Sequence, residues 1–151
     1  MIKKILLGIA VLGVIGVAVL GYGTYKFADE ALKEHEPQLR QYMQMDAAAQ
    51  NKYILDNAQE IFAKVDLDKD GKPEDKEQWE LMKQLNQKPE IQSAMIEVGR
   101  SVYAGTIMFS DSIVKDMSAD VKAKYQAEAD QFEARMDKYT KLLEDNGLKA
   151  K

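Results

Sequence analysis

Apolar residues recur every three or four positions along most of the chain, which is the spacing of one face of an α-helix. Short polar breaks divide this pattern into successive stretches. One covers residues 47–65 behind Asp46, which we expect to cap it, and a shorter one around Trp79 ends near Asn86. No alternation of polar and apolar residues competes as a strand signal. The pattern therefore predicts an all-α fold.

The last two stretches predict a long antiparallel helical hairpin over residues 89–146. Pro89 suits the first position of one helix, Ser118 is expected to cap the next, and Asn146-Gly147 suits its C-terminal end. The first helix carries its apolar stripe at Ile91, Met95, Val98, Val102, Gly105, Phe109 and Ile113. The second carries a heptad-spaced seam at Tyr125, Ala129, Phe132, Met136, Tyr139 and Leu143. We expect these stripes to form the core, although the seam would also suit a helix of another protein.

Residues 5–22 form an uncharged and almost wholly apolar run. As a helix this run would rise about 27 Å, close to the roughly 30 Å hydrocarbon core of a bilayer. Lys3 and Lys4 precede it, and aromatic residues follow it, as is typical of the two ends of a membrane span. The run predicts a single N-terminal transmembrane helix, a signal anchor, with residues 1–23 as cytoplasmic tip and span.

The compact positive charge at the N-terminus favours a cytoplasmic N-terminus and an extracytoplasmic C-terminal domain, periplasmic or at the cell surface. A cleaved signal peptide is the alternative, with Gly21-Tyr22-Gly23 as the processing site. Cleavage would leave a secreted helical binding protein.

The chain beyond the apolar run divides by composition. Residues 24–36 are highly charged and predict a helical stalk, and Pro37 then suits the first turn of the next helix. A helical domain follows over residues 37–147, and residues 148–151 read as a frayed tail.

The composition excludes several classes of function. The net charge of −4 offers no basic footprint for nucleic acid, and the absence of cysteine excludes disulfides, thiolate metal sites and cysteine nucleophiles. A single histidine, His35, lies in the charged stalk, and no phosphate loop, serine elbow or nucleotide fingerprint is present. We therefore expect neither catalysis nor a small-molecule substrate.

The most specific motif is the acidic segment 66–77, which has the spacing D-x-D-x-D-G-x5-E. Calcium takes six to eight oxygen ligands, and this spacing delivers them from one short piece of backbone. The candidate ligands are the carboxylates of Asp66, Asp68 and Asp70, the backbone carbonyl of Lys72, Glu74 acting through water, and bidentate Glu77. The sequence predicts one calcium site.

Residues 58–85 resemble a single EF-hand, because apolar residues flank the loop where the entering and exiting helices of that motif carry them. The loop departs from the family at its eighth position, where Pro73 stands in place of an aliphatic residue whose backbone pairs with a second hand. No second loop is visible. The resemblance implies a lone hand with weak, structural calcium binding. An acidic, solvated turn without a metal is the alternative.

Three functional hypotheses follow. The first is a membrane-anchored, non-catalytic accessory or scaffold subunit that meets protein partners through its membrane helix or its C-terminal hairpin. The second is a calcium-responsive regulator or sensor at the membrane. The third is the secreted binding protein that cleavage would produce. The sequence names neither the partner nor the process.

Overall fold

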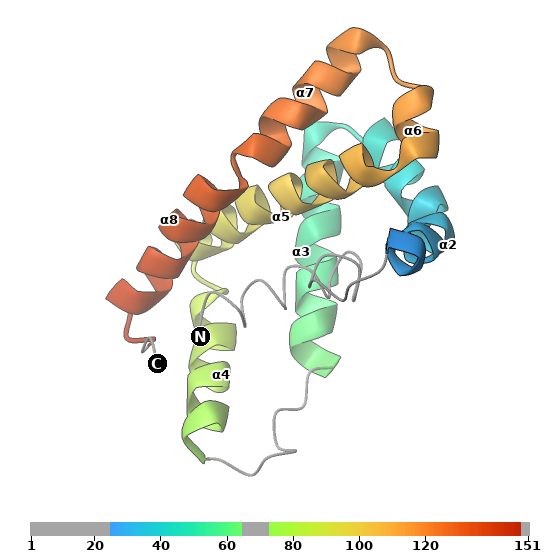
Figure 1. Cartoon of the computed structure of the whole chain (residues 1–151). Coiled ribbons are helices and arrows are strands. Elements are labelled where there is room, and N and C mark those ends of the chain that lie inside the picture. Colours follow the sequence, from blue (N-terminus) through green and yellow to red (C-terminus); the bar gives the residue numbers. More distant parts are fainter. Residues whose placement is uncertain (1–24, 65–72, 149–151) are drawn as a thin grey trace.

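The computed structural model describes residues 25–64 and 73–148, and every regular element in these ranges is a helix (Figure 1). The all-α prediction is confirmed. The helices are α2 (Tyr25–Gln44), α3 (Ala47–Lys64), α4 (Pro73–Leu85), α5 (Pro89–Phe109), α6 (Asp111–Lys115), α7 (Ala119–Asp130) and α8 (Phe132–Asp145).

None of the helices in the described ranges has both the length and the apolar composition needed to cross a membrane. The predicted span over residues 5–22 lies outside the described residues.

Helix α5 is the central element, and it is covered on several sides. It contacts α3, α6, α7 and α8, and the residues buried along it occupy more than one face. Two hydrophobic clusters form around its two ends. Ile91, Met95 and Val98 belong to the first, and Tyr103 and Ile107 belong to the second.

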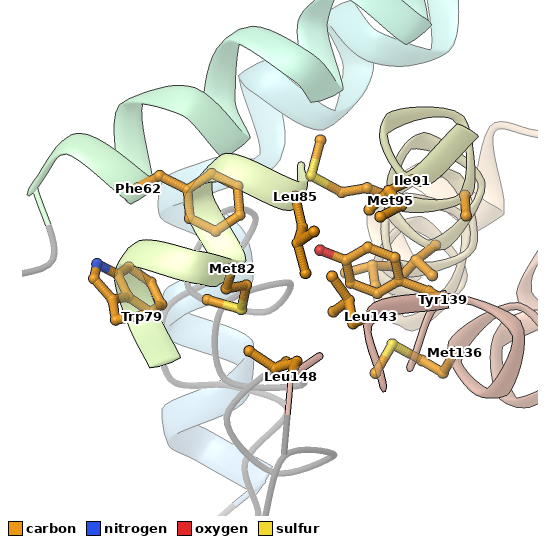
Figure 2. Packing of buried hydrophobic residues seen from close by; sticks show 13 residues of the cluster. Phe62, Trp79, Met82, Leu85, Ile91, Met95, Met136, Tyr139, Leu143 and Leu148 are labelled. Atoms are coloured by element: carbon orange, nitrogen blue, oxygen red, sulfur yellow. The ribbon is translucent and has the colours of Figure 1, made fainter. Parts of the chain in front are cut away.

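The first cluster joins α4, the start of α5 and α8, and it also takes in Phe62 from α3 (Figure 2). Met136, Tyr139 and Leu143, from the predicted heptad seam, are buried in it. The hydroxyl of Tyr139 donates to Oδ1 of Asn86 at 2.5 Å. That bond places a buried polar contact between α8 and the turn after α4.

The rings of three tyrosines from three helices contact one another at the second cluster. Tyr42 of α2 stacks on Tyr103 of α5 with ring centroids 4.5 Å apart, and Tyr53 of α3 meets Tyr103 edge-on at 5.5 Å. Such pairs each contribute about 0.5–1.5 kcal/mol beyond the area that they bury. The rings fix α2 and α3 against the end of α5.

The predicted hairpin is present, with α5 running along α7 and α8 in the opposite direction (Figure 1). Its two arms are less regular than the apolar spacing predicted. Ser110 adopts an extended conformation that ends α5, so Ile113 lies in the separate helix α6. Gln131 breaks the second arm into α7 and α8.

Three end signals are confirmed. The Asp46 carboxylate accepts from the backbone N–H of Ala49 at 2.8 Å, and the Ser118 hydroxyl accepts from that of Val121. Gly147 has a φ of 102°, in the left-handed region that favours glycine.

Two predicted boundaries are wrong. Helix α2 continues through Pro37. Proline has no N–H to donate within the helix, but the residue is exposed, so water can replace the missing hydrogen bond. Leu148 does not belong to a frayed tail, because it is buried and its N–H donates to the carbonyl of Leu143 at 3.0 Å. This bond and its apolar contact complete the Schellman motif at the end of α8.

Candidate functional sites

The predicted calcium loop joins α3 to α4 in the sequence, and both of these helices belong to the described residues. Asp66, Asp68, Asp70 and Lys72 lie outside the described residues. Helix α4 begins at Pro73, so the last part of the loop is helical.

Glu74 and Glu77 both belong to α4 and are three residues apart. Glu77 is exposed. Its carboxylate oxygens are of the type that calcium prefers as ligands. Within residues 25–64 and 73–148, no three acidic or histidine side chains cluster closely enough to hold a metal ion.

An aromatic contact ties the two helices together beside the loop. The ring of Phe62, near the end of α3, meets the ring of Trp79 in α4 edge-on, with centroids 5.7 Å apart (Figure 2). Both side chains are buried in the first cluster. One residue from each apolar flank of the predicted loop therefore packs against the other. Among the described residues, the buried Nε1 atom of Trp79 has no hydrogen-bond acceptor.

A pocket that the sequence did not reveal lies where α2, α3, α5 and α7 converge. Its volume is about 140 Å³. Ala47 and Gln50 of α3 and Ala104 of α5 line part of it, together with the two tyrosines Tyr42 and Tyr125. Its residues come from four different helices, so no local motif in the sequence could have revealed it.

The charged residues of this pocket are Arg100, Lys124 and Glu128. A guanidinium N–H of Arg100 donates to Oδ1 of Asn51 at 2.6 Å, a neutral partner. The Glu128 carboxylate is held by Arg135 at 2.7 Å. The hydrogen bond from Arg135 is the main reason that the pKa of Glu128 lies below its usual value, and charges on Arg135, Arg100 and Lys124 lower it further.

The phenol of Tyr42 faces the same charged groups. Burial is the main cause that raises its pKa, the nearby Tyr125 raises it further, and Arg100 acts in the opposite direction. Tyr42 therefore stays neutral at physiological pH and can donate a hydrogen bond. The Gln50 amide donates to the Tyr42 carbonyl at 3.0 Å, which fixes one wall of the pocket.

Comparison with models of protein families, with curated proteins and with solved structures found no match for this chain.

Proposed function

We propose that this protein is a membrane-anchored, non-catalytic helical subunit of a larger membrane complex, with one structural calcium ion bound in its EF-hand-like loop. The apolar run over residues 5–22 supports the anchor, and the all-helical body beyond it supports a scaffold role.

The Phe62–Trp79 contact is the observation that supports a structural role for calcium. It holds α3 and α4 together, the two helices that the acidic loop joins in the sequence. A cation bound by the loop carboxylates and Glu77 would add a second link between the same two helices. Calcium would then fix the angle between two helices that already share a core, which is the role of a clamp.

The calcium proposal is tested through Trp79, the single tryptophan of the chain. Titrating calcium into the full chain should change its emission with one-site saturation, at about 10⁻⁴–10⁻³ M if the lone hand is as weak as extracellular modules. Glu77→Gln should weaken binding at least about tenfold, because it removes the bidentate ligand. The matched control is Glu133→Gln, an exposed position on α8. Binding that is unchanged in the Glu77 variant rules out this site.

The anchor and scaffold proposal is tested separately. A reporter fused after Lys151 should be active only outside the cytoplasm, and the tagged full chain, extracted in mild detergent, should elute with a stoichiometric partner. A cytoplasmic reporter signal contradicts the orientation. A lone monomer in every detergent contradicts the subunit role.

A calcium-responsive regulator is the second candidate, and one observation favours it. Met82, Met95 and Met136 are buried in the first cluster (Figure 2). Calcium sensors expose methionine-rich surfaces when their helices open. A sensor should therefore bind an apolar dye more strongly with calcium, whereas a clamp should leave dye binding unchanged or reduce it.

A further inference from the structure

The pocket between α2, α3, α5 and α7 has an excess of positive charge. Two cations, Arg100 and Lys124, line it with a single carboxylate, Glu128, which Arg135 of α8 already engages from outside the lining. Within the described part of the chain, neither Arg100 nor Lys124 forms an ion pair. A guanidinium offers five N–H donors, so Arg100 retains donors beyond the one given to Asn51.

The size of the pocket restricts what can enter. A cavity of about 150 Å³ holds a benzene molecule, so the 140 Å³ found here admits a body of about one ring. Two alanines, Ala47 and Ala104, and the tyrosine side chains supply apolar walls. Gln50 and the hydroxyls of Tyr42 and Tyr125 add neutral hydrogen-bonding groups.

We propose that this pocket binds a small organic carboxylate whose body is about the size of one aromatic ring. The carboxylate pairs with Arg100, whose planar fork matches its two oxygens, and Lys124 contributes a second positive charge from the exposed side. The apolar body lies against the alanines and tyrosines. The ordered Tyr42–Tyr103 stack preforms one wall, so little of the binding energy is spent on ordering the site.

The proposal is independent of the calcium loop and of the membrane anchor. Every lining residue belongs to α2, α3, α5 or α7, none of them to the segment 66–77. Calorimetry with calcium and calorimetry with a carboxylate therefore report on different sites.

The test is a calorimetric titration of the full chain with benzoate, its neutral analogue benzamide, and inorganic phosphate. Benzoate should bind at one site with a Kd below about 1 mM, and benzamide and phosphate should bind at least about tenfold more weakly. Equal binding of benzoate and benzamide overturns the role of charge. Phosphate that binds as tightly as benzoate overturns the organic ligand. No saturable binding of benzoate overturns the site.

Variants locate the site. Arg100→Gln should weaken benzoate binding about tenfold or more, and Lys124→Gln about threefold to tenfold. Lys124 is exposed, so its variant tests the site even where loss of the Arg100–Asn51 bond disturbs folding. Lys122→Gln, an exposed lysine on the same helix outside the pocket, is the control with the same charge change. Benzoate binding that is unchanged in the Lys124 variant, or equally weakened in the Lys122 variant, overturns the assignment.

Discussion

Thr140 lies buried on α8, and its hydroxyl oxygen has no hydrogen-bond partner in the described part of the chain. A buried polar group without a partner costs about 1–3 kcal/mol of stability. Ser101 of α5 is equally buried but fully used, because its hydroxyl donates to the Glu128 carbonyl at 2.8 Å and accepts from Arg135 at 2.9 Å. The two hydroxyls should therefore have opposite effects on stability.

We expect Thr140→Val to raise the free energy of unfolding by about 1 kcal/mol, because a methyl group of nearly the same shape replaces an unsatisfied oxygen. Ser101→Ala should lower it by about 1–3 kcal/mol, because a buried carbonyl and a guanidinium each lose a partner. Urea unfolding of the full chain measures both. A destabilised Thr140 variant would show that its hydroxyl has a partner, such as a buried water.

Two glycines of α5 differ in the space around them. A Cβ at Gly99 would lie far inside contact distance of Cγ2 of Ile54, whereas a Cβ at Gly105 would meet that of Ala129 at an ordinary 3.9 Å. The contact at Gly99 is with the branched, stiff part of an isoleucine, so it is not easily relieved.

We expect Gly99→Ala to destabilise the protein by about 1–3 kcal/mol through overpacking between α3 and α5. Gly105→Ala should be neutral or stabilise it by up to about 1 kcal/mol through helix propensity. A double-mutant cycle with Ile54→Ala identifies the cause, because the cost of Gly99→Ala should largely vanish once Cγ2 is gone. Additive effects would contradict the close approach.

At the scale of elements, the junction of α5, α7 and α8 is held by polar contacts. Helix α7 has no fully buried residue, although Tyr125 packs half-buried against the second cluster, so polar contacts contribute much of what holds it. Arg135 of α8 binds Glu128 of α7 and the Glu97 carbonyl of α5. The contact between Arg135 and Glu128 is an ion pair only while the Glu128 carboxyl is ionised.

This junction predicts a pH dependence. The pKa of Glu128 is lowered in the folded protein, so its contribution to stability is present above the ordinary value of 4.5 and is lost as pH falls below it through the folded pKa. Glu128→Gln should lower stability near neutral pH and make the loss of stability from about pH 5 to pH 3 less steep. Glu133→Gln, on the exposed side of α8, should leave the slope unchanged. Thermal unfolding across this pH range measures the effect, and parallel profiles for wild type and the Glu128 variant would contradict it.

At the scale of the whole molecule, one helix links both hydrophobic clusters. Trp79 reports on the first cluster and the tyrosines around Tyr103 report on the second, and α5 passes through both. A rigid helix shared by two cores favours cooperative unfolding of the described body.

We expect Trp79 fluorescence and near-ultraviolet circular dichroism of the tyrosines to give the same midpoint in denaturant. Leu143→Ala, at a position with 0% exposure in the first cluster, should lower stability by about 2–5 kcal/mol and shift both signals together. Two separate midpoints, or a shift in the Trp79 signal alone, would show that the clusters unfold independently.

The sequence alone determined the features that depend on neighbouring residues. Helical spacing of apolar residues predicted the all-α class and the hairpin, and Asp46, Ser118 and Gly147 marked helix ends, because capping and periodicity act within a few residues. The acidic spacing of residues 66–77 predicts a calcium site in the same local way, and that prediction stands as a proposal.

Only the tertiary structure decided which faces meet. The burial of Leu148 in the first cluster, for example, depends on packing against helices distant in the sequence. The charged pocket joins Tyr42 to Arg100 and Lys124, residues far apart in the chain. Side chains of different helices form a shared site only once the helices have packed together. No local spacing of residues in the sequence determines how they pack.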